Sequence, residues 1–251
     1  MPGRFILAVS RFAIIVAMLA LWEFLSRSGI VNPRLLPSAS DTLSTLADLL
    51  QRSSVRNDLA VTATEVLTAF VLAVPFGCLL GYLIAEYRYF AKVMKPLLFF
   101  AFSIPKSIFL PMFILVFGVG FAEKVGFGFF STIFIVIMST TTAVESVKVE
   151  YLTVARSCGA TPAQTALRVY LPSMLPVLLE ALRISMIFNL TGVILAEMYA
   201  SRDGIGHQIA TWGENFQMKQ LLAGVVMIAV IAMAFNELVR WVETRCSHWR
   251  T

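Results

Sequence analysis

The sequence predicts an all-α, polytopic membrane protein, with about six transmembrane helices in a single transmembrane domain over residues 1–251. Of the 251 residues, 58% are hydrophobic and only 14% are charged, whereas soluble domains carry about 25% charged residues. Several apolar stretches reach the roughly 20 residues that a helix needs to cross a bilayer. One long segment between two of them is hydrophilic and carries helix-capping residues, which predicts a structured loop outside the membrane.

Six segments qualify as spans. Two of them, 66–85 and 125–144, contain no charged residue. The first apolar run is longer than the roughly 7–15 residues of a signal-peptide core and precedes no clear cleavage site, so we interpret it as a retained span. The expected spans are residues 5–25, 66–85, 97–122, 125–144, 174–200 and 221–241.

The distribution of Lys and Arg predicts the orientation. If the N-terminus is cytoplasmic, more of these residues fall in the inside segments than in the outside segments, as the positive-inside rule requires. We therefore expect both termini in the cytoplasm. The outside segment 26–58 then contains a helix that follows Pro37, is capped by Ser38 or Ser40, and lies at the outer membrane surface or against the bundle.

Proline and glycine modify two of the spans. Pro105 and Pro111 each remove a hydrogen bond from the helix, so the third span should be kinked or broken. In the second span, Gly77 and Gly81 leave room for another helix to approach closely. We expect that neighbour to belong to the same chain rather than to a second copy.

Several function classes are disfavoured by the composition. The net charge of +5 would suit nucleic acid in a soluble protein, but no basic run or aromatic-basic platform occurs, and no nucleic-acid partner is expected. The 3 cysteines and 2 histidines show no metal-ligand spacing and predict no disulfide framework. No catalytic constellation and no phosphate-binding loop of the Gly-x4-Gly-Lys-Ser/Thr type is present, so the sequence predicts no nucleotide site in this chain.

The hydrophilic segment 145–175 predicts a helical hairpin, and its first half ends at a glycine. Glu145 to Ser157 is compatible with a helix, and Gly159 follows directly. Glycine adopts the left-handed conformation that ends many helices because it lacks a Cβ atom. We therefore expect the first helix to end in a turn at Gly159.

A second short helix is predicted directly after this turn. Thr161 supplies an N-cap, Pro162 suits the first helical position, and Gln164 stands where a capping box needs it. Leu171-Pro172 should end the helix. Such a hairpin is either a docking element for a partner or a connector between two spans, and its length and its caps favour docking.

The hairpin resembles the signature of binding-protein-dependent ABC importer permeases. In that family the loop reads Glu-Ala-Ala, three residues, Gly, nine residues, Ile-x-Leu-Pro. The positions that agree with it in spacing are Ala155, Gly159, Val169, Leu171 and Pro172. Thr153 stands where the family has Glu, and Glu150 lies one turn earlier.

Further stretches are similar to the subgroup that imports nitrate, sulfonates, taurine and related small molecules. They are Leu36-Pro37-Ser38, Ile104-Pro105-Lys106, Leu110-Pro111, Phe117-Gly118-Val119-Gly120, Ala196-Glu197 and Gly204-Ile205-Gly206. One departure is early in the second span, where the subgroup tends to carry Arg and Gly and this chain has Glu65 and Ala69. Apart from this departure, the similar stretches run from Leu36 to Gly206, so the resemblance covers most of the chain.

The resemblance implies a permease subunit of the bacterial cytoplasmic membrane that has no enzymatic activity and binds no cofactor of its own. It implies a homodimer in the lipid bilayer, two copies of a separate ATPase that bind ATP and Mg²⁺, and an external binding protein. The cargo would be a small organic or inorganic solute, with an anion as one option. The hairpin would couple to the ATPase through Glu150, Ala155, Arg156, Gly159, Ala160, Thr161, Pro162, Gln164, Arg168, Leu171 and Pro172.

Polar residues inside the spans are candidates for the translocation pathway, because charges at membrane depth are costly. Lys106 either attracts an anionic substrate or pairs with Glu65. Asn189 and Thr191 either line the pathway or hydrogen-bond a neighbouring helix. Glu197, near the outer end of its span, either lines the pathway or orients the loop that follows it.

Two other functions remain as alternatives. An ion- or proton-coupled secondary transporter would use Lys106, Glu65 and Glu197 as its relay. A membrane scaffold without transport activity is the third class. Retention of an ATPase of separate sequence during purification would distinguish the permease from both.

Overall fold

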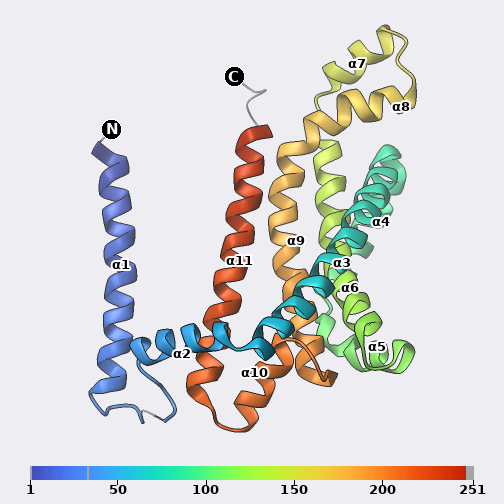
Figure 1. The fold of residues 1–251 in the computed structure, drawn as a ribbon. Coiled ribbons are helices and arrows are strands. Elements are labelled where there is room, and N and C mark those ends of the chain that lie inside the picture. The colour runs from blue at the N-terminus through green and yellow to red at the C-terminus, as the bar shows by residue number, and fades with distance from the viewer. Residues whose placement is uncertain (1, 33, 247–251) are drawn as a thin grey trace.

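A computed structural model describes residues 2–32 and 34–246, and this part of the chain is helical (Figure 1). The α-helices are α1 (Pro2–Arg27), α2 (Ala39–Gln51), α3 (Ser53–Glu86), α4 (Arg88–Ser103), α5 (Leu110–Phe117), α6 (Phe121–Glu145), α7 (Val149–Ser157), α8 (Pro162–Thr165), α9 (Leu171–Ala200), α10 (Ile205–Glu214) and α11 (Met218–Cys246). A 3₁₀ segment, η1 (Lys106–Phe109), precedes α5, and a π-helical segment, η2 (Ala166–Tyr170), joins α8 to α9. The predicted all-α fold class is confirmed.

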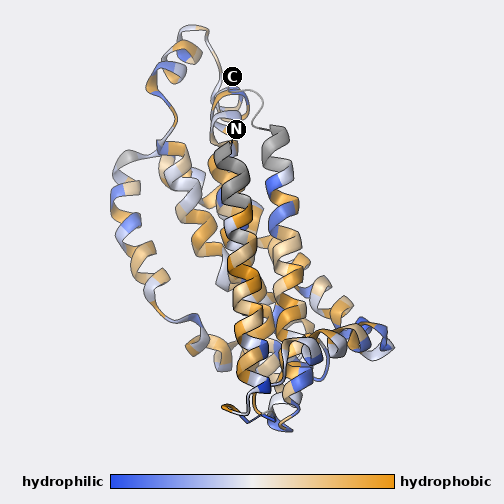
Figure 2. Ribbon diagram, turned by 90° about the vertical axis from the view of Figure 1, so that its left-hand side faces the viewer, coloured by the Kyte–Doolittle hydropathy of each residue, from blue (hydrophilic) through white to orange (hydrophobic). Residues whose placement is uncertain are grey.

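Four of the described helices are long and apolar enough to cross a membrane. They are α3, α6, the continuous helix Pro162–Ala200, and α11 as far as Trp241. α4 and the η1–α5 segment form a bent pair that would count as a fifth span. The first expected span, 5–25, lies within α1, a helix of 26 residues. Figure 2 shows hydrophobic residues along the upright helices and more hydrophilic residues near their ends, as a bilayer requires.

The third span is broken, as its prolines predicted. α4 ends at Ser103, and the axis turns by 79° into η1 and α5. Ile104 adopts an extended conformation with φ −72° and ψ 128°, because the helical region is disfavoured for a residue that precedes proline. α5 then ends at Phe117 and α6 already begins at Phe121. The boundary between the third and fourth spans therefore lies earlier than the expected limit of 97–122.

α3, α6 and α9 pack side by side and form the centre of the bundle. A Cβ atom added at Gly77 would lie 2.7 Å from Cγ1 of Val136, and one added at Gly81 would lie 2.7 Å from the carbonyl oxygen of Ile137. Both neighbours belong to α6, so the two glycines serve packing within the chain, as expected. Their missing side chains let α3 and α6 approach closely.

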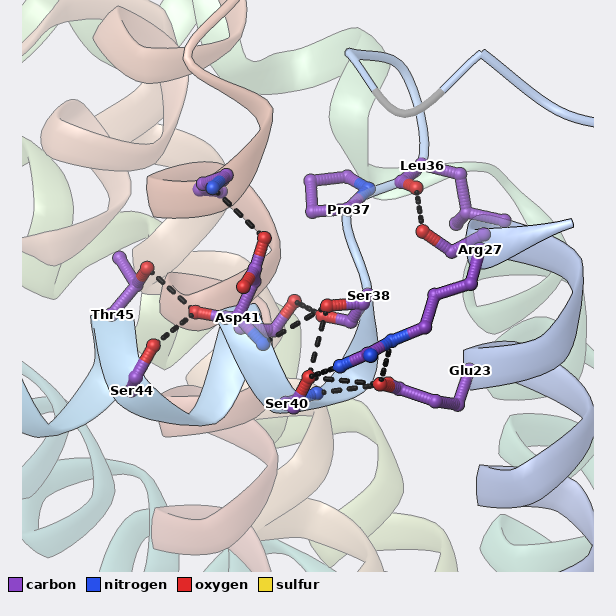
Figure 3. Close-up of polar contacts among 12 residues, drawn as sticks. Glu23, Arg27, Leu36, Pro37, Ser38, Ser40, Asp41, Ser44 and Thr45 are labelled. Carbon is purple, nitrogen blue, oxygen red and sulfur yellow. Dashed lines mark hydrogen bonds and ion pairs between the residues drawn. The ribbon is translucent and has the colours of Figure 1, made fainter. Parts of the chain in front are cut away.

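α2 lies across one end of the bundle and ties α1 to α11 (Figures 1 and 3). Ser38 is its N-cap and accepts a hydrogen bond from the backbone N–H of Asp41 at 3.1 Å, which confirms one of the two expected caps. Ser40 instead bonds to α1, and its backbone N–H and its hydroxyl donate to the Glu23 carboxylate at 3.1 and 2.9 Å. Asp41 pairs with Lys219 of α11 at 2.9 Å.

The described chain begins and ends at the same side of the molecule. Figure 1 shows the start of α1 and the end of α11 at the side that carries α7 and α8, whereas α2, α5 and α10 lie at the opposite side. We call these two sides the hairpin end and the α10 end.

Candidate functional site

The hairpin consists of α7, a glycine turn and α8. We expected its first helix to begin at Glu145, but Glu145 is the last residue of α6, and α7 begins only at Val149. Between them, Val147 is 7% exposed and packs with Val144 in a core cluster. Burying Val147 against the bundle requires the chain to leave the helix here, and a periodic pattern does not show that break.

Gly159 ends α7 as predicted. Its φ is +72°, in the left-handed region that favours glycine. The backbone N–H of Ala160 donates to the carbonyl of Ala155, and that of Gly159 donates to the carbonyl of Arg156, both at 3.0 Å. This pair of bonds is a Schellman motif, which satisfies carbonyl groups that the helix end would otherwise leave free.

The predicted capping box at the start of α8 is also confirmed. The hydroxyl of Thr161 accepts a hydrogen bond from the backbone N–H of Gln164 at 3.3 Å. The side-chain oxygen of Gln164 accepts one from the backbone N–H of Thr161 at 2.9 Å. Pro162 occupies the first turn, where its missing N–H costs nothing.

The expected end of the second helix at Leu171-Pro172 is wrong. The helix continues from Pro162 to Ala200, and η2 forms the junction. The backbone N–H of Leu171 donates to the carbonyl of Ala166, five residues back. A wider π turn accommodates Pro172, which cannot donate the usual α-helical bond. Figure 1 shows the helix turning here rather than ending.

The hairpin exposes most of the residues that were predicted to couple to a partner. Ala155 is buried and Ala160 is half-buried. The exposed ones are Glu150, Arg156, Gly159, Thr161, Pro162, Gln164, Arg168, Leu171 and Pro172. Among them stand exposed apolar side chains, namely Tyr151, Val154, Leu167 and Leu171, each between 47% and 65% exposed. Such a mixed surface is typical of a docking site.

Glu65 does not pair with Lys106, which was one of the two options for that lysine. Its carboxylate forms an ion pair with Lys124 of α6 at 2.5 Å, and the two side chains are 1% and 4% exposed. Lys124 also donates to the hydroxyl of Ser201 at 3.1 Å. Lys124 falls between the expected spans 97–122 and 125–144, and no sequence pattern predicted this contact because it joins residues that are far apart along the chain.

Lys106 lies at the break between α4 and α5 and is half-buried. Its ammonium donates to the carbonyl of Phe102 at 3.3 Å. It also lies 4.2 Å from the centre of the Phe102 ring and 5.9 Å from that of Phe188 on α9. No carboxylate pairs with it among the described residues.

Glu197 holds the start of α10. One carboxyl oxygen accepts a hydrogen bond from the hydroxyl of Thr62 at 2.6 Å, and the other accepts one from the backbone N–H of Gly206 at 2.7 Å. The hydroxyl of Thr62 in turn accepts from the backbone N–H of Ile205 at 2.9 Å. Glu197 therefore orients the loop that follows it, which was one of its two expected roles.

One face of α3 carries the polar residues that hold this loop. Asp58 accepts hydrogen bonds from the backbone N–H of Gly204 at 3.1 Å and from the side chain of Gln208 at 2.8 Å. Asp58, Thr62 and Glu65 are spaced four and three residues apart, so they share a helix face. That spacing was the signal in the sequence that could have identified the face, although not its partners.

The remaining pathway candidates lie on α9. The side chain of Asn189 donates to the carbonyl of Val66 on α3 at 2.7 Å, which is the interhelical bond proposed as one of its roles. Thr191 is exposed, and its hydroxyl donates to the carbonyl of Ile187 in its own helix at 2.7 Å. The two residues thus point in different directions from the same helix.

Glu123 is a buried carboxyl group that sequence reasoning missed. It is 0% exposed, and neither side-chain oxygen has a hydrogen-bond partner within the described part of the chain. It lies in the first turn of α6, where the helix dipole favours negative charge, next to Lys124. In the sequence, Glu123 is not distinguishable from any other acidic residue in the first turn of a helix, so its burial could not be predicted.

Of the three residues of the hypothetical relay, Lys106 lies apart from the two glutamates. Lys106 rests on Phe102, Glu65 pairs with Lys124, and Glu197 bonds to Thr62 and Gly206. Glu65 and Glu197 also interact with each other, whereas the contacts of Lys106 are with Phe102 and Phe188. Within the described part of the chain, Lys106 is therefore separate from the other two groups of the relay.

Apolar helices long enough to cross a membrane, with the capped hairpin at one end and the contacts of Thr62 and Glu197 with α10 at the other, define a multi-pass membrane protein. Residues 73–248 match the family described as "Binding-protein-dependent transport system inner membrane component". The protein belongs to this family of ABC importer permeases, multi-pass proteins of the inner membrane whose ATPase is a separate subunit.

Individual relatives extend over nearly the whole chain. The taurine transport system permease TauC of Escherichia coli K12 is 26% identical over 240 residues, which cover 94% of this chain and 87% of TauC. The putative aliphatic sulfonates transport permease SsuC of Bacillus subtilis 168 is 24% identical over 233 residues, which cover 93% of this chain and 84% of SsuC.

Solved structures share the fold. A bacterial ABC transporter involved in the import of the acidic polysaccharide alginate superimposes with a TM-score of 0.68 at 15% identity, covering 97% of this chain and 99% of that chain. The inward-facing MetNI methionine transporter superimposes with a TM-score of 0.64 at 19% identity, covering 78% and 95%. The alginate transporter has also been solved in complex with its alginate-bound periplasmic protein.

Proposed function

We propose that this permease forms the pathway of an importer for a small sulfonate-type anion. The observation that supports an anionic cargo is the position of the Lys106 ammonium. It lies in the broken third span without a carboxylate partner among the described residues. A charge inside a membrane is costly unless it is paired or functional. An anionic cargo would supply the missing partner transiently.

The groups around Lys106 orient it without neutralising it. The carbonyl of Phe102 belongs to the last turn of α4, and the rings of Phe102 and Phe188 present their faces to the ammonium. Carbonyl groups at a helix C-terminus and aromatic faces carry only partial negative charge. The full positive charge is therefore available to an anion, and its attraction is stronger in a region of low dielectric constant than in water.

Three other buried charged residues already form contacts within the fold. Glu65 and Lys124 neutralise each other, and Glu197 holds the start of α10. We therefore assign these groups to stabilising the fold and not to selecting a cargo. Taurine and aliphatic sulfonates, the cargoes for which TauC and SsuC are named, both carry a sulfonate group, which fits an unpaired cation.

The hairpin supports the rest of the assembly. Its caps and its exposed apolar and charged side chains suit docking on a separate ATPase, which would bind ATP and Mg²⁺. Two such ATPases, a second copy of this chain and an external binding protein complete the proposed importer. Since α1 starts and α11 ends at the hairpin end (Figure 1), both termini would be cytoplasmic.

Uptake of labelled taurine into proteoliposomes tests this proposal, with the ATPase and the binding protein encoded by neighbouring genes. Lys106→Gln should lower ATP-driven uptake at least about tenfold, because one lost ion pair of about 1.4 kcal/mol already has that effect. Lys106→Arg should retain most of it. Lys92→Gln, which removes an exposed charge from the same segment, is the control and should transport normally.

Two results would contradict the proposal. Wild-type uptake rates in Lys106→Gln would remove the argument for an anionic cargo. Uptake that needs an ion gradient but neither ATP nor the ATPase would favour the secondary transporter instead.

A further inference from the structure

The base of the hairpin is part of the core of the bundle. Val147 and Leu152, before and within α7, pack in one cluster with Val169 and Tyr170 of η2. The same cluster includes residues from the hairpin ends of three spans, namely Tyr82 and Ala85 of α3, Val144 of α6, and Met174 and Leu178 of α9. The tip of the hairpin is exposed, so the element has an anchored base and a free end.

One aromatic contact joins this base to α3. The rings of Tyr82 and Tyr170 lie edge to face, with centroids 5.6 Å apart and planes inclined by 80°. Both side chains are half-buried. An edge-to-face pair at this distance contributes more free energy than the burial of its apolar area alone. The contact joins η2, which leads into α9, to a different span, α3.

The covalent route from the hairpin to α9 is weakened at the same point. Tyr170 is the last residue of the π segment, and Pro172 and Pro176 follow within the first turns of α9. Proline removes backbone hydrogen bonds, and π turns are sites where helices bend. A displacement of the hairpin would be partly absorbed by bending here unless a side-chain contact carried it into the bundle.

We propose that Tyr170 is a positioning residue that transmits movement of the hairpin to α3, with Tyr82 as its partner. The proposal rests on the proposed function, in which the hairpin docks on an ATPase. With the ring in place, α3 and α9 follow the hairpin together. Without it, the hairpin tilts at η2 and ATP hydrolysis continues with less transport.

The test measures the number of solute molecules transported per ATP hydrolysed, in proteoliposomes that contain the permease–ATPase complex and receive loaded binding protein. Tyr170→Ala and Tyr82→Ala should each lower this ratio about two- to tenfold, the range that the strength of one aromatic pair implies. The double variant should be no worse than the poorer single variant. Tyr170→Phe keeps the ring and should behave as wild type, as should Tyr89→Ala, which truncates an 82% exposed tyrosine at the start of α4.

Docking is measured separately, so that loss of binding is not mistaken for loss of transmission. Cys158 is exposed at the hairpin turn, and in a chain with Cys78→Ser and Cys246→Ser it is the only thiol for maleimide labelling. Bound ATPase should protect Cys158 equally in wild type and in Tyr170→Ala.

Three outcomes would overturn the proposal. One is a double variant whose effect is the product of the two single effects, because Tyr82 and Tyr170 would then act independently. Another is loss of Cys158 protection in Tyr170→Ala, which would make the ring necessary for docking. The third is an unchanged ratio in both single variants while the wild type couples normally. If the wild-type chain neither binds an ATPase nor shows protection, the proposed function itself fails, and the role of Tyr170 with it.

Discussion

Gly204→Ala should destabilise the protein far more than Gly118→Ala, although both glycines share an uncommon backbone conformation. Gly204 has φ 101° and ψ 159°, and Gly118 has φ 72° and ψ 174°. Residues with a side chain rarely adopt this region, and forcing alanine into it costs about 1–3 kcal/mol. Both variants should lose that amount of unfolding free energy.

The surroundings of the two glycines differ, and this difference sets the magnitude. A Cβ atom at position 204 would lie 2.0 Å from Oε1 of Glu197, whereas nothing lies within 4 Å of one at position 118. Glu197 must therefore move, which breaks its bonds with Thr62 and with the N–H of Gly206. Hydrogen bonds to a carboxyl group are worth about 1–3 kcal/mol each. Gly204→Ala should thus lose about 2–6 kcal/mol more than Gly118→Ala.

Unfolding in mixed micelles with increasing SDS, followed by helical circular dichroism, measures this difference. In a Glu197→Ala background the additional loss should disappear, because both the clash and the two hydrogen bonds are gone. Equal unfolding free energies for the two glycine variants would refute the reasoning. So would an additional loss that persists without the Glu197 side chain, since Glu197 would then not be the group that excludes a Cβ atom.

Three further changes test other parts of the structure. Gly159→Val strains the left-handed turn by at least about 1 kcal/mol, so substrate-stimulated ATP hydrolysis should fall while helical content is kept; unchanged stimulation would argue against the role of the hairpin. Lys124→Met leaves Glu65 buried and unpaired and should lower the unfolding free energy by about 3–5 kcal/mol, most of which Glu65→Gln should restore if the charge is the cause. A hydrogen bond from Lys219 lowers the pKa of Asp41 below its ordinary 3.8; the stability from this pair is therefore present above about pH 4 and is lost as the pH falls through the lowered pKa. The thermal midpoints of wild type and Asp41→Asn should accordingly differ at pH 6 and converge as the pH falls below the lowered pKa of Asp41, and a difference independent of pH would contradict this.

Local features of the hairpin were predictable because their partners are close in sequence. Gly159 bonds across its own turn, and Thr161 and Gln164 cap each other three residues apart. The break near Pro105 was predictable for the same reason, because proline restricts the residue directly before it. Pro172 shows the limit of such reasoning, because a π turn allowed the helix to continue through a residue that normally ends one.

The sequence by itself determined the membrane class, the broken span and the caps of the hairpin, since these follow from composition or from neighbours within a few residues. Only the tertiary structure decided which buried charges meet. It pairs Glu65 with Lys124, assigns Glu197 to the start of α10, and leaves Lys106 on aromatic rings. The reason is geometric: whether two side chains on different helices touch depends on the rotation and depth of each helix, and hydrophobic periodicity in a nearly uniform apolar span specifies neither.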